Sequence, residues 1–329
     1  MKIAIDIMGG DYAPTELVRG ALAAAAAWPQ HHLIMVGRKD ALPAQLPANC
    51  SFHEADQVMG MDENVENLRQ KKNSSIWQAT LLVKEGRADA LVSAGSTAAQ
   101  MAAAVLLLGR VKGVSRPAIG GVIPGLTEER VALDIGANTE CTPAMLLQFA
   151  QMGKVFAEVL LKRENPRICL LSNGSEAHKG NELIRAAHTL LAESPLNFIG
   201  NMEGSDIFSG DFDVMVFDGF SGNIAIKSAE GAVAVIMSLL KTELTASLRS
   251  KIGAVLVKPG LKRVKDRLDY QEFGGAPLLG VNGVSIVCHG SSKARAIVNA
   301  VGQAALAVEA GFISRIGAAL AQDIPEKGV

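Results

Sequence analysis

Cysteine is scarce in this chain. Four cysteines occur among 329 residues, at positions 50, 141, 169 and 288, and none belongs to a CxxC pair. A chain of this length can bury roughly three quarters of its unfolded surface without disulfide or metal cross-links. We therefore expect a reduced cytoplasmic protein.

An excess of charge of either sign is also missing. The chain carries 32 Lys and Arg against 33 Asp and Glu, which gives a formal net charge of −1. Binding along a nucleic-acid backbone normally needs a broad excess of Lys and Arg, so we expect no nucleic-acid partner. Met1 and Lys2 lead directly into an apolar run that contains Asp6, which argues against a secretory signal.

Several familiar motifs are absent as well. The sequence contains no GxGxxG, GxxxxGK[ST], GxSxG or HExxH, which weakens nucleotide-binding, serine hydrolase and zinc protease interpretations. The six histidines are not spaced as a ligand set with the cysteines, so we expect no metal and no cofactor. The longest uncharged window, 90–109, reaches the ~20 residues of a membrane span. Its internal SAGST turn favours a buried strand and helix instead.

What recurs along the chain is an apolar run that ends in a turn rich in small or polar residues. The repeats are IAIDIMGGD, LVSAGST, VALDIGAN, ICLLSNGSEAHKGN, VMVFDGFSGN and SIVCHGSS. Each is followed by helical periodicity, which predicts a mostly parallel α/β sheet whose turns share one edge. Ligands of such sheets bind at that edge, and helix N-termini attract anions. The pattern therefore predicts an anion-binding site.

The same patterns place the individual elements in one continuous domain, 1–329. Strands are expected near 3–7, 33–37, 90–93, 119–123, 131–135, 168–171, 214–217 and 284–288. Helices are expected near 15–27, 75–85, 98–108, 143–162, 180–192, 222–244 and 293–310. The segment 55–73 is the expected mobile loop.

The alternation of strands and helices stops at about 245–273. Two basic amphipathic stretches, RSKIGAVLVK and LKRVKDRL, flank Pro259-Gly260 there, which predicts a basic helical hairpin. Subunit packing with a solvated charged face, contact with a membrane surface, and docking of an acidic partner are all compatible with it. The candidate contact residues are Val255, Leu256, Lys258, Lys262, Arg263 and Lys265.

Two turns carry the clearest chemistry. In SNGSEAHKGN, Lys179 stands beside a helix start, which is typical of a phosphate site. In FDGFSGN, Asn223 can donate to an oxygen that develops charge. The candidates around them are Gly174, Gly180, Asn181, Asp218 and Gly222, and the other strand ends add Gly9, Gly10, Asp11, Ser96, Asn138, His289 and Ser291. The alternative is that Ser and Asn only cap helices and Gly only shapes turns.

Carboxylates and one cysteine near this edge remain open to two interpretations. Asp6, Asp11, Asp134 and Asp218 could act as bases or magnesium ligands, or could hold loops by accepting backbone N–H groups. Cys141 stands near an expected helix start, where a thiolate would be favoured, but no other feature marks it as a nucleophile.

Taken together, the motifs resemble those of the bacterial phosphate acyltransferases of phospholipid synthesis, the PlsX family, nearly end to end. The motifs that carry the resemblance are DIMGGDYAP, SRPAI, ALDIGAN, PAMLLQFAQMG, HKGNELI, FIGNMEGSDIFSGDFDVMVFDGFSGN and FGGAPLLGVNGVSIVCHGSS. Departures from the family pattern lie at Ile7 and Tyr12 and in the loops around Ser96 and Ser172.

The resemblance implies a three-layer αβα fold, doubly wound and like that of isocitrate and isopropylmalate dehydrogenases. It also implies transfer of a long-chain acyl group from acyl carrier protein to inorganic phosphate, with Lys179 and Asn223 as catalytic residues. The implied protein is a homodimer, peripheral on the inner face of the cell membrane, where a glycerol-3-phosphate acyltransferase is a further partner. A short-chain phosphotransacetylase that uses coenzyme A and a non-catalytic carrier-protein or lipid-binding module are the alternatives.

Overall fold

The computed structural model describes residues 1–125, 128–268 and 274–322, without the side chains at 265, 266, 268 and 322. Within these residues, one 11-stranded sheet runs through the molecule in the order β3-β2-β1-β4-β11-β10-β5-β6-β9-β7-β8. The strands are β1 (Lys2–Asp6), β2 (His32–Gly37), β3 (Cys50–Glu54), β4 (Ala90–Ser93), β5 (Ala118–Ile123), β6 (Arg130–Leu133), β7 (Ile168–Leu171), β8 (Phe198–Met202), β9 (Val214–Val216), β10 (Ala276–Leu279) and β11 (Val284–Val287).

Most strand pairs are parallel, which confirms the predicted fold class. The antiparallel exceptions among the described strands are β10 with β11, β10 with β5, and β5 with β6. These pairs lie at the middle of the sheet, where the chain returns after building the β5 to β9 half. The sheet thus consists of an N-terminal lobe, β3-β2-β1-β4-β11, and a C-terminal lobe, β5-β6-β9-β7-β8, joined through β10.

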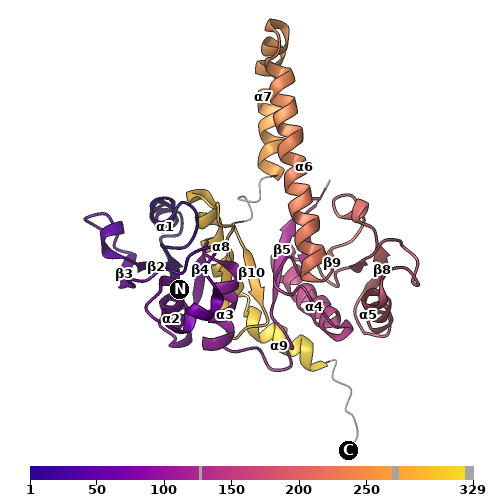
Figure 1. The fold of residues 1–329 in the computed structure, drawn as a ribbon, viewed down its shortest axis with the longest axis horizontal. Helices are drawn as coiled ribbons and strands as arrows, with labels where there is room; N and C mark the ends of the chain where they lie inside the picture. Colours follow the sequence, from indigo (N-terminus) through magenta and orange to yellow (C-terminus); the bar gives the residue numbers. More distant parts are fainter. Residues whose placement is uncertain (126–127, 269–273, 323–329) are drawn as a thin grey trace, which may run out of the picture.

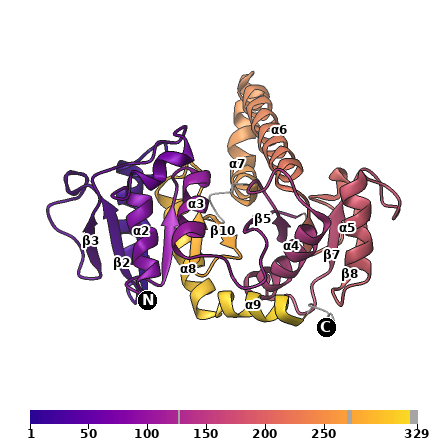
Figure 2. The ribbon, with the colours of Figure 1, turned by 60° about the horizontal axis from the view of Figure 1, so that its bottom comes forward.

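The helices form layers on both faces of the sheet. They are α1 (Thr15–Ala27), α2 (Ser75–Lys84), α3 (Thr97–Leu107), α4 (Pro143–Phe156) with a π-helical turn (Ala157–Leu161), α5 (Glu182–Ala192), α6 (Gly219–Thr245), α7 (Leu248–Leu268), α8 (Ala294–Glu309) and α9 (Phe312–Gln322). Figures 1 and 2 show the two lobes on either side of the projecting α6 and α7, with α9 running between the lobes on the opposite side.

Both faces of the central strands are buried, which explains their continuous apolar sequences. In β1, Ile3 and Ile5 pack with α1, α8 and the α4 side of the molecule, whereas Ala4 packs with α2 and α3. On the far face of the C-terminal lobe, Phe217 packs with Phe212 and the base of α6. The window 90–109 forms β4 and α3, as its turn predicts.

Three strands and one helix were not predicted, and each has a physical reason. β3 is an edge strand with the polar sequence CSFHE, and β8 contains Gly200 at φ 101°. β10 contains Pro277, which normally counts against a strand. The helix α9 begins directly after Gly311, at φ 62°, so its sequence pattern merges with that of α8.

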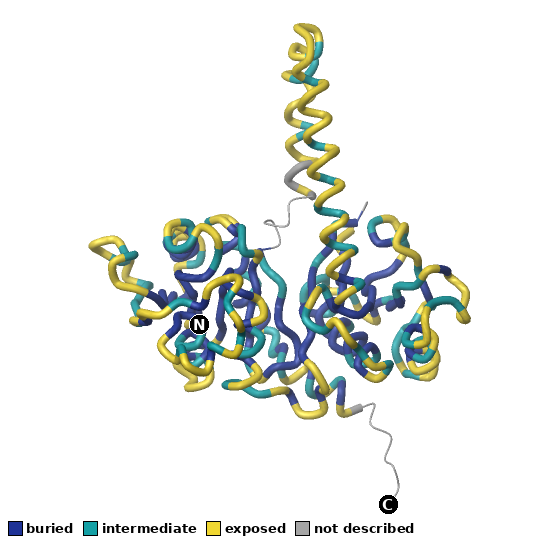
Figure 3. Tube along the Cα trace, viewed as in Figure 1, coloured by how far each residue is buried: buried dark blue, intermediate teal, exposed yellow. Residues whose placement is uncertain are grey.

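The predicted position of the hairpin turn was wrong. Pro259 lies inside α7, and the chain reverses between Thr245 and Leu248, so α7 pairs with α6 rather than with itself. Inside a helix, proline removes one backbone hydrogen bond and its ring crowds the carbonyl four residues earlier, but α7 continues through Pro259 to Leu268. The pair projects from the body as a long arm (Figures 1 and 3), which we call the α6–α7 arm.

The segment 55–73, expected to be mobile, has local structure of its own. It contains a short 3-10 helix, Val65–Arg69, whose Leu68 is fully buried. Glu63 accepts from Lys71 Nζ at 2.7 Å and from the Gly60 N–H at 3.0 Å, and these contacts lower the pKa of Glu63 to about 2. The hydrogen bonds of the Glu63 carboxylate therefore hold this segment in a defined conformation.

By length and composition alone, two described helices could cross a membrane. The first, Pro143–Leu161, has 61% of its apolar window buried inside the body. The second, Gly219–Thr245, has none of its window buried. The first is a core helix, whereas the apolar residues of the second face solvent along the arm.

Candidate active site

The N-terminal half of the site is organised by a buried carboxylate at the end of β1. Asp6 is 1% exposed and accepts from Ser93 Oγ at 2.8 Å and from the Met8 N–H at 3.1 Å. Burial raises the pKa of Asp6, and these hydrogen bonds oppose the rise. Ser93 Oγ in turn accepts from the Gly95 N–H at 3.0 Å. Of the two interpretations of this carboxylate, the structure supports the one in which it holds loops.

The turn that follows β1 packs tightly against its neighbours. A Cβ on Gly9 would lie 2.7 Å from Asp6 Oδ2, and Gly10 adopts φ 108° beside the carbonyl oxygens of Ala94 and Gly290. The Asp11 N–H donates to the Gly290 carbonyl at 2.8 Å. The backbone therefore approaches here more closely than any side chain would permit. The predicted residues Gly9, Gly10 and Asp11 meet the turn that follows β11.

That turn after β11 carries His289 and Ser291. His289 Nδ1 lies 2.7 Å from Ser291 Oγ. Ser96, at the end of the turn after β4, accepts from the Ala99 N–H at 3.5 Å and caps α3. The strands β1, β4 and β11 are hydrogen-bonded neighbours, so the predicted residues that follow them gather at one edge.

The C-terminal half is built around Asp134, which is fully buried at the end of β6. Its carboxylate accepts from the N–H groups of Ile119, Gly136, Ala137 and Asn138 at 2.8 to 3.3 Å, and from Asn138 Nδ2 at 2.9 Å. Burial raises the pKa of Asp134, and the hydrogen bonds from Ala137, Ile119 and Asn138 oppose that rise. Asn138 Nδ2 also donates to the Pro117 carbonyl at 2.7 Å. The carboxylate thus fixes the loop 135–138.

This loop fits directly against the first turn of α6. The Gly219 N–H donates to the Asn138 carbonyl at 2.7 Å, and Asp218 caps the helix by accepting from the Ser221 N–H at 2.9 Å and from Ser221 Oγ at 2.8 Å. A Cβ on Gly222 would lie 2.2 Å from the Asp134 carbonyl, so only glycine fits there.

Asn223 follows at this helix start and is exposed, next to Gly136. None of the described residues hydrogen-bonds its side-chain amide. The amide is therefore available to a substrate oxygen, as its predicted role requires.

Lys227, a residue that the sequence interpretation missed, joins the two halves of the site. Lys227 Nζ lies 2.9 Å from His289 Nε2 and 2.7 Å from Glu230 Oε2. Burial, followed by the charge of Lys227, lowers the pKa of His289, whereas Glu230 and Asp11 oppose this effect. Lys227 stands four residues after Asn223, and residues at this spacing lie on the same helix face. That spacing was the signal available in the sequence GNIAIK.

The loop around Lys179 lies one strand further out. It follows β7, which pairs with β9, so it shares the sheet edge with the start of α6. Asn181 caps α5 by accepting from the Ile184 N–H at 2.9 Å, and Gly180 adopts φ 91° with its N–H donating to Asn173 Oδ1 at 2.9 Å. Lys179 is half-buried, and its stem lies where a Cβ on Gly174 would be 2.8 Å away. No hydrogen bond among the described residues joins this loop to Asn223.

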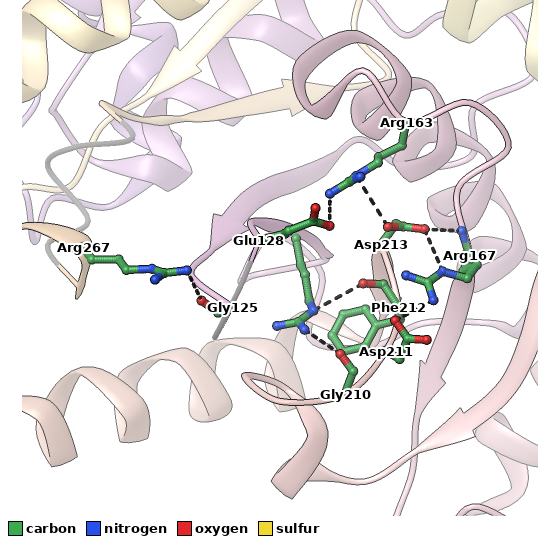
Figure 4. Close-up of polar contacts among 10 residues, drawn as sticks. Gly125, Glu128, Arg163, Arg167, Gly210, Asp211, Phe212, Asp213 and Arg267 are labelled. Atoms are coloured by element: carbon green, nitrogen blue, oxygen red, sulfur yellow. Dashed lines mark hydrogen bonds and ion pairs between the residues drawn. The ribbon is translucent and has the colours of Figure 1, made fainter. Parts of the chain in front are cut away.

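Several arginines of the C-terminal lobe serve the architecture rather than a ligand. Arg130 donates to the carbonyls of Phe208, Gly210 and Phe212. Figure 4 shows Asp213 between Arg163 and Arg167, at 3.7 Å and 3.2 Å. The same view shows the Arg267 guanidinium of α7 on the Gly125 carbonyl, at 3.0 Å. These contacts hold the segment 208–213 and the base of the arm.

Cys141 lacks the environment of a nucleophile. Burial, together with Asp134 and Asp218, raises the pKa of the Cys141 thiol to about 11. The Sγ atom lies 3.5 Å from the Asn138 carbonyl, to which the neutral thiol donates. The expectation of a favoured thiolate was wrong, because burial of the thiol and the nearby carboxylates outweigh the effect of the start of α4 at Pro143.

We expect the Cys141→Ser variant to retain most of its activity, since the neutral thiol contributes only a weak hydrogen bond. Turnover and iodoacetamide labelling at pH 7 would be measured together, and labelling of the wild type should be slow because the thiolate is rare at that pH. A folded variant without turnover, or an acyl thioester trapped on Cys141, would contradict this expectation.

Comparisons with known sequences and structures relate this chain to known proteins. The model of the fatty acid synthesis protein family matches residues 1–315. A phosphate acyltransferase from Heliobacterium modesticaldum is 50% identical over 99% of this chain and 98% of its own. A phosphate acyltransferase from Desulfitobacterium hafniense (strain DSM 10664 / DCB-2) is 50% identical over 96% of both chains. Among solved structures, a phosphotransacetylase from Streptococcus pyogenes shares the fold, with a TM-score of 0.61 at 19% identity over 95% of this chain and 94% of its own.

At this level of identity over the full length, the protein is an acyltransferase. The chain belongs to the fatty acid synthesis protein family that contains the bacterial phosphate acyltransferases. The predicted family and enzyme class are thereby confirmed.

Proposed function

We propose that the protein transfers a long-chain acyl group from acyl carrier protein to inorganic phosphate. The observation that carries the proposal is the near-complete match to phosphate acyltransferases, which makes phosphate the acceptor. The resemblance of the motifs supplies the acyl donor. The product is an acyl phosphate, an activated acyl group for phospholipid synthesis.

The geometry of the site supports a direct displacement. Phosphate near pH 7 is partly dianionic, so an oxygen can attack the thioester carbonyl without a strong protein base. A C–O bond forms, the C–S bond breaks, and the thiolate leaves and takes up a proton. In this proposal Asn223 and the N–H groups at the start of α6 receive the charge that builds on the carbonyl oxygen. The remaining task of the protein is to hold the two reactants together.

The proposal is tested by incubating the purified protein with palmitoyl acyl carrier protein and phosphate, and by trapping acyl phosphate with hydroxylamine. Formation of palmitoyl hydroxamate is expected, and acetyl-coenzyme A should be a poor donor. Faster turnover of acetyl-coenzyme A would instead indicate a short-chain phosphotransacetylase. Binding of the carrier protein without any acyl phosphate would indicate a non-catalytic module.

Lys179 is proposed to bind the phosphate. The Lys179→Ala variant should raise the phosphate KM about tenfold to a hundredfold, because a charge-assisted hydrogen bond contributes about 1.5–3 kcal/mol. Steady-state kinetics at saturating acyl donor would measure this change, with Lys84→Ala, at an exposed lysine of α2, as the matched control. An unchanged KM with a lower Tm would make Lys179 a structural residue of the loop.

The α6–α7 arm is proposed to meet the partners of this protein. Its exposed apolar residues include Val235 (59%), Leu239 (61%), Leu248 (77%) and Ile252 (61%). Soluble monomers rarely leave so much contiguous apolar surface uncovered. We propose a homodimer along α6 and a peripheral contact of α7 with the inner face of the cell membrane. The acidic carrier protein and a membrane-bound acyltransferase are the proposed protein partners.

Two variants separate these contacts. Val255 and Leu256, 71% and 77% exposed, would be replaced by Ser, and separately Lys258, Lys262 and Arg263 would be replaced by Glu. We expect the apolar change to release the protein from anionic liposomes while soluble turnover persists, because membrane attachment needs the apolar face. Co-sedimentation and the KM for the carrier protein would be measured. Normal liposome binding by both variants would exclude the arm as the membrane contact. Lys265, also predicted as a contact, has no described side chain.

A further inference from the structure

We propose that Lys227 is an anion-binding residue of the active site and that His289 is the residue that positions it. The inference rests on the proposed function, because the anion is taken to be the phosphate acceptor. It assigns a cation to the helix face that already carries Asn223. It also explains why Lys227 and His289 contact each other between the two lobes.

The first step of the argument is the direction of the Lys227 side chain. Side chains in an α-helix lean toward its N-terminus, so a long side chain covers the preceding turn. The preceding turn of α6 contains Asn223. Lys227 Nζ therefore belongs on the substrate side of the helix start, where an anion also meets backbone N–H groups.

The second step is the number of donors on the ammonium group. A lysine has three N–H donors and no acceptor. Within the described residues, two of them are directed at Glu230 Oε2, at 2.7 Å, and at His289 Nε2, at 2.9 Å. One donor remains, and the side chain is 48% exposed. The ammonium group is thus held in place while it still presents one N–H to solvent.

The third step concerns His289, whose second ring nitrogen, Nδ1, contacts Ser291 and so orients the ring. Nδ1 lies 2.7 Å from Ser291 Oγ and 3.2 Å from the Ser291 backbone nitrogen. We infer the tautomer that is protonated on Nδ1, in which the ring donates to Ser291 Oγ and accepts from Lys227 at Nε2. Neutral imidazole is the form that accepts, and the direction of the His289 pKa shift favours that form. Because His289 follows β11 and Lys227 belongs to α6, this hydrogen bond fixes the cation across the gap between the lobes.

The test compares Lys227→Met with Lys227→Arg, and uses Lys84→Met, at an exposed lysine of α2, as the control. We expect Lys227→Met to raise the phosphate KM about tenfold to a hundredfold while the KM for the acyl donor stays constant. Lys227→Arg should recover part of the loss because it keeps the charge. A phosphate KM equal to that of Lys84→Met, with turnover and Tm reduced, would overturn the inference and leave only a structural bridge between the lobes.

The positioning role of His289 has its own pair of variants. Gln places an amide oxygen near the position of Nε2, whereas Asn places its amide near Nδ1. We expect His289→Gln to preserve a larger share of phosphate affinity than His289→Asn. Equal effects of the two variants, or an increase in the donor KM instead of the phosphate KM, would overturn the role.

A binding measurement without turnover separates this inference from the proposed function. Titration of inorganic phosphate by calorimetry, on the wild type and on Lys227→Met, needs no acyl donor. Loss of phosphate binding in the variant supports the inference even if no acyl phosphate is ever formed. Equal phosphate binding in the two proteins overturns it even if acyl phosphate is formed by both.

Discussion

The Asn223→Ala variant is expected to lose roughly a hundredfold or more in kcat, with little change in the phosphate KM. Removal of one donor to a developing oxyanion costs about 2.7–4 kcal/mol in the transition state and little in the ground state. Asn223 is suited to this task because it is exposed at the first turns of α6 and no described residue hydrogen-bonds its amide. Steady-state kinetics with varied phosphate and varied acyl donor would measure the split between kcat and KM.

The control for this variant is Asn282→Ala. Asn282 is an exposed asparagine whose Nδ2 donates to the Arg110 carbonyl at 2.8 Å, outside the site. Its replacement should leave kcat nearly unchanged. If Asn223→Ala changed only a KM, the side chain would bind substrate equally in the ground state and the transition state, and the oxyanion role would be wrong.

The second large effect is expected for Asp134→Ala. Loss of the carboxylate leaves the buried N–H group of Ile119 and the half-buried N–H groups of Ala137 and Asn138 without their acceptor, and a buried donor that is left unpaired costs about 1–3 kcal/mol. The free energy of unfolding should therefore fall by about 1–3 kcal/mol through Ile119, with smaller added losses from the other two groups. Urea denaturation followed by circular dichroism would measure it.

The matched control is Asp40→Ala, which removes an aspartate whose side chain is 73% exposed and lies 3.5 Å from Arg38. Such surface pairs contribute about 0–1 kcal/mol. Asp134→Ala should also lower turnover, because the loop that it fixes meets Gly219 through the Asn138 carbonyl. Stability equal to that of the Asp40 variant would show that the loop holds itself without the carboxylate.

The parts of the fold that sequence predicted are those whose signal is local. Central strands such as β1 and β9 are buried on both faces, so their apolar runs are unmistakable. β10 was not predicted because Pro277 counts against a strand, and the strand forms through its antiparallel pairing with β11 and β5. The reversal of the arm was misplaced because Pro259-Gly260 is the strongest turn signal in that segment, whereas the structure turns at residues without such a signal.

The sequence predicted which residues follow the strands at this edge of the sheet, but not how those residues contact one another. Glycines at close backbone contacts, such as Gly9 and Gly222, can be predicted because they follow an expected strand directly. The functions of polar side chains are harder to foresee. Asn181 and Asp218 serve as helix caps in the structure, which leaves a substrate role for them as a prediction. Lys227 was missed because its partner, His289, stands 62 residues away in the sequence.

The helix α6 has 27 residues and is therefore about 40 Å long. It begins beside the candidate active site and ends on the exposed arm, so a single helix connects the two. Near its start, Gly222 packs directly against the Asp134 carbonyl, which fixes this end of the helix. Asn223 and Lys227 follow Gly222 within the next two turns of α6. A tilt of the outer part of the helix would therefore move Asn223 relative to the loop 135–138 and Lys227 relative to His289. A partner that binds the arm would therefore act, through α6, on the positions of Asn223 and Lys227.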